Sequence, residues 1–363
     1  MKKIKVVSLF SGCGGLDYGF KQSNYNIIWA NDILKDACST YAHNIGDHIV
    51  CGDINSINKN VIPKADIIVG GPPCQSFSLV GKRDPNDERS NMVWSYLEVL
   101  KHVNPKLFLL ENVTGLLSAK NPDGSKVLEH LTSAFQDLGY SIAVHKLNAA
   151  DYGVPQRRVR VFLIGSKNGD EIPAPPVTNS KEKGALPFWV SVEEALSDLP
   201  ATSANGKCKY SSLPKSDYQQ RMRIRQNGQV SLHITPYASE KDKELMEHIP
   251  PGGNYQDVPD NVATTRILNF KKTGGRTTTY GRLSKDMPSY TLNTHFNRLN
   301  VGCNIHYDKK RLISLREGLR LQSFPDDFEV ISSNKRNYYV QIGNAVPPML
   351  GKIWADHLNK YFE

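Results

Sequence analysis

The residues Ile4-Lys5-Val6-Val7-Ser8-Leu9-Phe10-Ser11-Gly12-Cys13-Gly14-Gly15-Leu16 join an apolar run directly to a glycine-rich turn. An apolar run that ends in glycines and opens into a helical pattern is typical of the first strand, turn and helix of an open α/β sheet. Glycine lets the backbone approach a ligand closely, because no side chain intervenes. We therefore predict a ligand site at this turn. A purely structural strand-to-helix turn is the alternative explanation for the glycines alone.

Short apolar runs alternate with helical patterns through residues 1–165, which predicts stacked β-α units and a mostly parallel sheet. The expected strands are Ile4–Phe10, Asn26–Ala30, Ile49–Cys51, Asp66–Val69, Leu107–Leu110, Ser141–Lys146 and Val159–Ile164. The expected amphipathic helices between them are Leu34–His43, Met92–Val103 and Lys126–Leu138. The predicted fold class is α/β, with a doubly wound, mostly parallel sheet and a second, smaller, irregular and mainly β domain.

Composition limits the possible classes of protein. The length of 363 residues predicts about two domains, and 45 Lys and Arg against 36 Asp and Glu give a net charge of +9. This charge favours an anionic partner. Six scattered cysteines, without a C-x-x-C pair, predict neither a disulfide framework nor a metal site. No apolar run could span a bilayer, and the N-terminal run is too short for a secretion signal, so we expect a cytoplasmic protein.

A change in composition after Gly165 marks a second domain. Residues 167–187 are rich in Pro, Ser, Lys and Gly, and residues 188–307 have weak periodicity. A helical pattern returns at Ser314–Gln322, and the last helix, expected at Met349–Asn359, is predicted to rejoin the first domain. We therefore predict a discontinuous first domain, 1–165 plus 308–363, and a second domain at 166–307.

Most of the excess positive charge lies within the second domain. Residues 261–307 contain seven Lys and Arg but only one acidic residue, Asp286. Thr, Tyr, Asn and His residues, which can bond phosphates and base edges, lie between these charges. This mixture favours nucleic-acid binding over the alternative of a solvated basic face.

Acidic residues follow the next two expected strands. Asp32 lies about 20 residues after the glycine-rich turn, where an acid can accept the ribose hydroxyls of an adenosine, and Asp53 ends the following strand. The turn does not have the G-x-G-x-x-G spacing, because Asp17 lies three residues after Gly14. This departure favours S-adenosylmethionine over a nicotinamide dinucleotide, since S-adenosylmethionine has no pyrophosphate to place at the helix terminus.

The fourth expected strand leads into Gly70-Gly71-Pro72-Pro73-Cys74-Gln75-Ser76-Phe77-Ser78. Ligands of open α/β sheets bind at the carboxyl ends of strands, where this segment falls. Paired prolines restrict the backbone that presents Cys74, which favours a rigidly held nucleophile. A small buried cysteine in a turn is the alternative.

Further ionisable groups follow later strands. Glu111 comes directly after Leu107–Leu110, where an ionised carboxylate is costly to bury, so we expect it to bond a ligand. A surface Glu that caps a helix is the alternative.

Arg158 and Arg160 alternate along an expected strand and are predicted to share one face, which suits an anion or an oxygen atom. Surface arginines on an edge strand are the alternative.

Eight sequence blocks together resemble the ordered motifs of the DNA (cytosine-5)-methyltransferases of bacterial restriction-modification systems. They are Phe10–Leu16, Asp32, Asp53, Gly71–Gln75, Glu111–Val113, Gln156–Arg160, Arg316–Glu317 with Leu321–Pro325, and Gln341–Pro348. The resemblance covers residues 1–165 and 308–363 and implies that residues 166–307 form the variable target-recognition domain. It also implies the S-adenosylmethionine-dependent methyltransferase fold.

The resemblance implies a role for each matching residue. Cys74 would attack C6 of a flipped cytosine, Glu111 would hold N3, and Arg158 and Arg160 would contact the region of the target base. Implied cofactor contacts are Phe10, Gly12, Gly14, Asp32, Ile33, Asp53, Ile54, Pro73, Asn344 and Val346. Expected DNA contacts are Gln75, Ser78, Lys82, Arg89, Arg276, Thr291 and Arg298. Ile33 is aliphatic where the family often has an aromatic residue, so weaker stacking on adenine is expected.

The resulting prediction is an enzyme that methylates C5 of cytosine in a short duplex DNA sequence. We expect S-adenosylmethionine as cofactor, no metal, double-stranded DNA as partner, a partner restriction endonuclease and a monomer. The alternatives are a tRNA cytosine-5 methyltransferase, whose Cys-Phe-Thr signature is absent, a DNA-binding subunit without catalysis, and a nicotinamide-dependent dehydrogenase.

The affinity for duplex DNA should depend strongly on salt. If about six basic residues contact phosphates, log affinity should fall with a slope of about −5 against log salt concentration. Affinity should then fall roughly a thousandfold between about 50 and 200 mM salt. Fluorescence anisotropy over a salt series measures the slope, and a slope near zero would contradict a DNA substrate.

Overall fold

The computed structural model describes residues 3–73, 92–121, 123–182, 184–223 and 228–362. Within them the chain forms two compact units. Unit 1 contains residues 1–148, 159–176 and 350–363, and unit 2 contains residues 149–158 and 177–349. No helix in the described ranges is long and apolar enough to cross a membrane.

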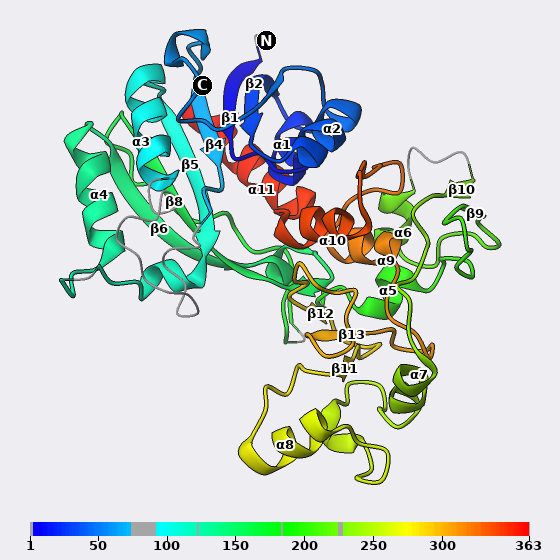
Figure 1. Ribbon diagram of the computed structural model, residues 1–363. Helices are drawn as coiled ribbons and strands as arrows, with labels where there is room; N and C mark the ends of the chain where they lie inside the picture. Colours follow the sequence, from blue (N-terminus) through cyan, green and yellow to red (C-terminus); the bar gives the residue numbers. More distant parts are fainter. Residues whose placement is uncertain (1–2, 74–91, 122, 183, 224–227, 363) are drawn as a thin grey trace. The chain divides into compact units, whose positions relative to one another are not determined.

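A mixed sheet forms the centre of unit 1 (Figure 1). Its strands are β1 (Ile4–Leu9), β2 (Tyr25–Asp32), β3 (Ile49–Cys51), β4 (Ile67–Gly70), β5 (Leu107–Val113), β6 (Ser141–Asn148) and β8 (Val159–Ser166). In the described part, seven strands lie in the order β3-β2-β1-β4-β5-β8-β6. The first five run parallel, and β8 runs antiparallel to both β5 and β6. The predicted doubly wound, mostly parallel sheet is therefore confirmed.

The helices of unit 1 lie close to their predicted positions. They are α1 (Gly15–Lys21), α2 (Lys35–Asn44), α3 (Met92–Val103), α4 (Val127–Asp137) and the part of α11 (Pro348–Leu358) that begins at Leu350, with 3-10 turns η1 (Lys59–Val61), η3 (Thr114–Leu117) and η6 (Asn359–Tyr361). Residues 350–363, which contain most of the last helix, belong to unit 1. Gly351 allows this close packing, because a Cβ there would lie 2.6 Å from the Leu16 carbonyl oxygen.

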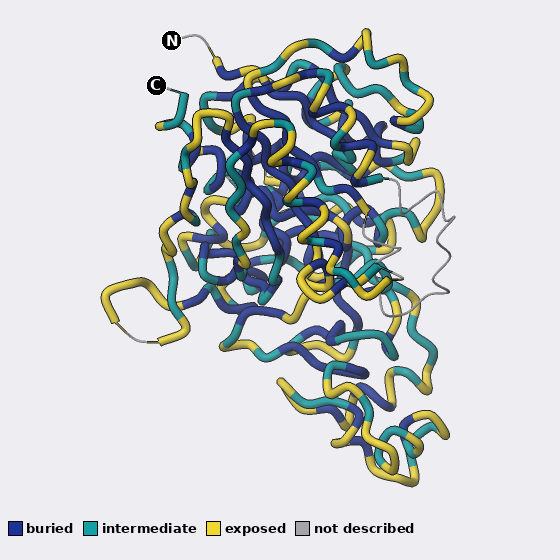
Figure 2. The backbone as a smooth tube through the Cα atoms, turned by 90° about the vertical axis from the view of Figure 1, so that its left-hand side faces the viewer, coloured by how far each residue is buried: buried dark blue, intermediate teal, exposed yellow. Residues whose placement is uncertain are grey.

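The core of unit 1 is formed by strands that are apolar on both faces. Residues 107–110 of β5 are fully buried, as expected for a central strand that is covered on both faces. The Phe108 ring packs on Phe135 and Tyr140, with centroids 4.6 and 5.2 Å away. Gly165, opposite Phe108 in β8, leaves room for that ring, since a Cβ there would lie 2.0 Å from Phe108 Cε1. Figure 2 shows such buried stretches in dark blue.

Unit 2 is irregular, as predicted for residues 166–307. Its strands are β7 (Gln156–Arg157), β9 (Cys208–Lys209), β10 (Gln229–Val230), β11 (Gly281–Arg282), β12 (Ser289–Tyr290) and β13 (Cys303–Ile305). They pair as β7 with β12, β9 with β10 and β11 with β13. Helical segments accompany them: η4 (Ala149–Tyr152), α5 (Val192–Leu196), α6 (Asp217–Met222), α7 (Glu240–Glu247), η5 (Tyr255–Asp257), α8 (Thr265–Thr273), α9 (Leu315–Leu321) and α10 (Lys335–Asn344). Ser191, Ser239 and Ser314 begin α5, α7 and α9 with capping boxes.

The compact units divide the chain at different places from the predicted domains. Residues 308–349, expected with the first domain, belong to unit 2, and residues 166–176 belong to unit 1. The physical reason is that α9 is buried along its whole length and carries arginines whose partners lie in the irregular region. The functional assignment of 166–307 to target recognition stays a prediction.

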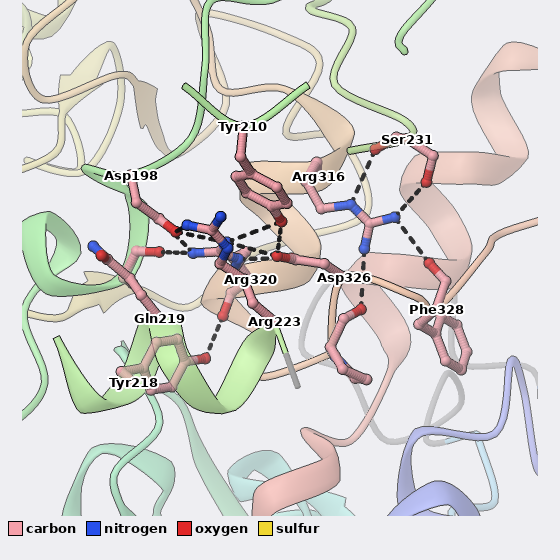
Figure 3. A network of polar contacts seen from close by, with 12 residues as sticks. Asp198, Tyr210, Tyr218, Gln219, Arg223, Ser231, Arg316, Arg320, Asp326 and Phe328 are labelled. Carbon is pink, nitrogen blue, oxygen red and sulfur yellow. Dashed lines mark hydrogen bonds and ion pairs between the residues drawn. The ribbon is translucent and has the colours of Figure 1, made fainter. Parts of the chain in front are cut away.

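A buried network of charges connects α9 to the rest of unit 2 (Figure 3). Arg320 Nη1 lies 2.8 Å from Asp198 Oδ1, and Arg320 Nη2 lies 2.6 Å from Asp326 Oδ2, with all three side chains fully buried. Arg316, also buried, donates to Ser231 Oγ at 2.9 Å and to the Phe328 carbonyl at 3.0 Å. Buried charges are tolerated only when paired and hydrogen-bonded in this way.

Removing one carboxylate from this network should destabilise unit 2. Asp198→Ala leaves the buried Arg320 with one of its two acidic partners, so we expect a loss of about 3–5 kcal/mol in the free energy of unfolding. Urea unfolding followed by tryptophan fluorescence measures this loss. Lys310→Ala, which removes the exposed partner of Glu247, is the control and should leave the midpoint almost unchanged. Equal midpoints for the two variants would contradict the assigned role.

Candidate active site

The glycine-rich turn after β1 has the backbone conformation that its sequence predicts. Gly12 and Gly14 have φ of 56° and 88°, and Phe10 takes a φ of 54°, which is unusual for a residue with a side chain. A Cβ at Gly14 would lie 2.2 Å from Ile45 Cδ1, so this glycine is required for packing. A Cβ at Gly12 would meet nothing within 4 Å, so the backbone there borders open space. The turn can therefore accept a ligand at Gly12.

Asp32, the last residue of β2, holds this turn. Its Oδ2 accepts a hydrogen bond from Gly12 N at 2.8 Å, and its Oδ1 accepts one from Leu34 N at 2.8 Å. Burial raises the pKa of the Asp32 carboxyl, and the two N–H donors oppose that rise. Each carboxylate oxygen keeps a second acceptor position, so the predicted bonds to ribose hydroxyls stay possible. Sequence reasoning missed the role of Asp32 in ordering the backbone.

The residues beside Asp32 fit the base of an adenosine. Ile33 is 65% exposed although it is apolar. The buried Ile54 lines a hollow together with Asn55, Trp94 and Ser95. Asp53, before Ile54, accepts a hydrogen bond from Asn55 N at 3.0 Å. An exposed apolar side chain next to a buried carboxylate offers one surface to a ring and one acceptor to a sugar. The described residues of unit 1 therefore fit an adenosyl cofactor.

The ends of β4 and β5 bring the Gly-Pro-Pro segment against Glu111. Asn112 Nδ2 donates to the Pro72 carbonyl at 3.2 Å and so fixes the backbone of this segment. A Cβ on Gly71 would lie 3.0 Å from Glu111 Oε2, so glycine there leaves room for the carboxylate. Glu111 is the fifth residue of β5, whereas the sequence placed it just after a shorter strand. Pro73 is exposed at the end of the described segment.

Glu111 forms a buried ion pair with Arg160. Glu111 Oε1 lies 3.0 Å from Arg160 Nε, and both side chains are nearly buried. Antiparallel pairing sets Glu111 opposite Phe162, two residues from Arg160, so the two charged side chains share a face. Burial lowers the pKa of the Arg160 guanidinium, and the Glu111 carboxylate opposes this. Glu111 Oε1 is therefore directed at the Arg160 guanidinium, while Oε2 lies on the side of Gly71.

Arg158 has different surroundings from those predicted. It lies between β7 and β8 rather than within a strand, so strand alternation does not place it on one face with Arg160. Arg158 is buried in unit 2 and donates to the carbonyls of Leu292 and Asn344, both at 3.3 Å. These bonds connect three distant segments of unit 2. A contact of Arg158 with the target base stays a prediction.

Other predicted contacts are distributed over both units. Asn344 is the exposed last residue of α10, and Val346 is buried just after it, both in unit 2. Arg276 and Arg298 are exposed in unit 2. Thr291 Oγ1 donates to the Arg157 carbonyl at 2.8 Å, so its hydroxyl supports the pairing of β7 and β12. Five predicted site residues lie outside the described residues: Cys74, Gln75, Ser78, Lys82 and Arg89.

Sequence reasoning also missed a buried amide that organises unit 2. Gln156 Nε2 donates to the Leu321 carbonyl at 3.0 Å, and Gln156 Oε1 accepts from Leu292 N at 2.9 Å. It thereby connects the start of the Gln156–Arg160 block to α9 and to Leu292. The sequence blocks that contain Gln156 and Asn112 indicated that both residues matter. Local spacing, however, does not show which distant residues they bond.

Comparison with known proteins identifies the relatives of this chain. The family model described as C-5 cytosine-specific DNA methylase matches residues 4–360. The type II methyltransferase M.NgoFVII of Neisseria gonorrhoeae is 37% identical, over 95% of this chain and 84% of that protein. M.DdeI of Desulfomicrobium norvegicum, also a type II methyltransferase, is 33% identical over 99% of this chain and 89% of its own length.

Solved structures share the fold. A putative DNA modification methyltransferase encoded within an E. coli prophage has a TM-score of 0.76 at 24% identity, with 99% of each chain covered. The S. pombe Dnmt2 methyltransferase has a TM-score of 0.59 at 20% identity, over 99% of each chain.

Asp32→Asn should weaken binding of an adenosyl cofactor. The amide keeps one acceptor, but its NH2 group faces one of the two backbone donors, so the turn loses a charge-assisted hydrogen bond worth about 1.5–3 kcal/mol. We expect about 10- to 100-fold weaker binding of S-adenosylhomocysteine in titration calorimetry. The matched control Asp47→Asn changes an exposed acid outside the turn and should bind normally. Normal affinity in a folded Asp32→Asn variant would contradict this role.

Proposed function

The chain belongs to the C-5 cytosine-specific DNA methylase family, and from this premise we propose that a flipped cytosine reacts at the ends of β4 and β5. The protein is a DNA (cytosine-5)-methyltransferase, which transfers a methyl group from S-adenosylmethionine to C5 of cytosine in DNA. The observation that carries the proposed location is the buried Glu111 carboxylate, held between Gly71 and Arg160 beside the Gly-Pro-Pro segment.

The chemistry needs an activated pyrimidine carbon. The Cys74 thiolate adds to C6 of cytosine, which makes C5 nucleophilic enough to take up a methyl group. Glu111 bonds the ring at N3 and stabilises the charge that develops during the addition. After transfer, loss of the C5 proton and expulsion of the thiolate release 5-methylcytosine. An unshifted thiol is only a few per cent ionised near neutral pH, so nearby cations would assist Cys74.

Arg160 and Arg158 complete the proposed catalytic set. Arg160 orients the carboxylate of Glu111 through the 3.0 Å ion pair and can also donate to an oxygen of the base. Arg158, the other arginine of the proposed set, holds the backbone of unit 2 through its bonds to the Leu292 and Asn344 carbonyls. Truncating either partner of the Glu111–Arg160 pair leaves a buried charge without its counter-ion, which is costly.

The methyl donor would be held by the residues of the glycine-rich turn and their neighbours. S-adenosylmethionine supplies an electrophilic methyl group when bound. Phe10, Gly12 and Gly14 shape the turn, while Asp32 would accept ribose hydroxyls. The remaining proposed contacts are Ile33, Asp53, Ile54, Pro73, Asn344 and Val346.

The proposed substrate is a short duplex sequence whose cytosine is flipped out, because a stacked base cannot reach a buried carboxylate. Residues 166–307 would recognise this sequence, with Arg276, Thr291 and Arg298 near the DNA. Gln75, Ser78, Lys82 and Arg89, which lie outside the described residues, are further proposed DNA contacts. We further propose a monomer in the bacterial cytoplasm that associates with the nucleoid through DNA.

We propose that the enzyme modifies DNA beside a partner restriction endonuclease, and the names of its relatives support this role. M.NgoFVII, M.DdeI and M.AgeI are named type II methyltransferases, and the chain covers at least 84% of each. These relatives favour DNA over the alternative of a tRNA substrate. Labelled methyl transfer to duplex DNA and to tRNA, measured side by side, distinguishes the two substrates.

Covalent trapping tests the proposed reaction. Fluorine at C5 of the target cytosine blocks the loss of the C5 proton, so the enzyme should stay attached to 5-fluorocytosine DNA. Cys74→Ala should give no adduct, and Glu111→Gln should lower the rate of labelled methyl transfer by about 10²- to 10⁴-fold. Glu129→Gln, which changes an exposed acid on α4, should keep the rate of the natural protein. An undiminished adduct in Cys74→Ala would defeat the proposal.

A further inference from the structure

Two cysteines that the proposed reaction does not use lie close together near Asp32. Cys38 is buried on α2, and Cys51 is the exposed last residue of β3. Neither is disulfide-bonded. Both cysteines belong to unit 1, so the contacts around them lie within one compact unit.

Hydrogen bonds set the position of Cys38 relative to β3. The Asp32 carbonyl oxygen accepts the Cys38 thiol, with Sγ at 3.3 Å, and also accepts Gly52 N at 2.9 Å. Gly52 directly follows Cys51, and Cys51 pairs with Asp32 in the β2–β3 register. The Cys38 thiol and the backbone next to Cys51 therefore share one acceptor atom.

The faces of β3 agree with this placement. Val50 packs against the apolar core that includes α3 and α4, so side-chain alternation directs Cys51 to the opposite face of the sheet. Helix α2 packs on β3 with its buried side, which includes Cys38. The thiols also interact: burial and then the hydrogen bond with Cys51 raise the pKa of Cys38.

We propose that Cys38 and Cys51 are a modification site. Small disulfides such as glutathione disulfide oxidise the two thiols to a reversible intramolecular disulfide, which weakens cofactor binding. Bridging would draw the Cys38 sulfur away from the Asp32 carbonyl and pull the start of α2 towards β3. Leu34, whose N–H holds Asp32 Oδ1, immediately precedes that helix. The effect on affinity rests on the proposed cofactor site, whereas the disulfide does not.

The reaction is a two-step exchange that transfers two electrons. The Cys51 thiolate, which is exposed, attacks one sulfur of glutathione disulfide and expels one glutathione thiolate. Cys38 then passes its thiol proton to the expelled glutathione thiolate, and its sulfur attacks the Cys51 sulfur of this mixed disulfide, forms the Cys38–Cys51 bond and expels the second glutathione thiolate. The two protein thiols are oxidised to one disulfide, and the two thiol protons pass to the two glutathione molecules.

The test uses the full chain with Cys74→Ser, so that the proposed nucleophile does not react. After treatment with glutathione disulfide, peptide mass spectrometry should find a linked Cys38–Cys51 peptide lighter by two hydrogens. Calorimetry with S-adenosylhomocysteine should show about tenfold weaker binding, which a dithiol reductant restores. Cys208→Ser, added as the matched control in unit 2, should behave identically, whereas added Cys51→Ser should keep full affinity after oxidation.

The two measurements separate the possible failures. Absence of the linked peptide overturns the disulfide, and a linked peptide with unchanged affinity overturns its effect on the cofactor. A linked peptide in a protein that binds no S-adenosylhomocysteine even when reduced supports the disulfide and counts against the proposed cofactor site.

Discussion

The register of the parallel strands in unit 1 is the constraint on which the candidate site depends. Leu9 pairs with Asn31 on one side and with Gly70 on the other, and Gly70 pairs with Leu110. The residues that follow these strand positions are therefore delivered to one edge of the sheet. Glycine at position 70 is part of this constraint, because a Cβ there would lie 2.4 Å from the Leu9 carbonyl oxygen.

Asp32 and Glu111, two buried carboxylates at this edge, differ in the groups that their oxygens contact. Both oxygens of Asp32 accept backbone N–H groups from the segments on either side, so Asp32 orders the chain as well as facing the turn. Glu111 instead faces one guanidinium, that of Arg160, whose Nε lies 3.0 Å from its Oε1. Geometry thus separates a carboxylate that shapes the backbone from one that can act on a ligand.

The fold of unit 2 is specified mainly by hydrogen bonds from buried side chains. Its paired strands are two or three residues long, too short to specify a fold by ladder hydrogen bonds alone. Directional bonds from buried side chains take that role: Arg320 joins Asp198 to Asp326, and Gln156 connects three segments. Fully satisfied polar networks specify one arrangement, because every alternative leaves a buried group unpaired.

The amino-acid sequence by itself determined the strands and helices of unit 1, the acids at strand ends and the family motifs, because hydrophobic periodicity and motif spacing are local properties. Only the tertiary structure decided that β8 inserts antiparallel between β5 and β6, that residues 308–349 join unit 2, and that Arg158 bonds carbonyls of distant segments. The close approach of Gly71 to Glu111 and the hydrogen bond from Gly12 N to Asp32 likewise could not be predicted from the sequence. Such contacts join residues far apart in the chain, and close packing in three dimensions selects them.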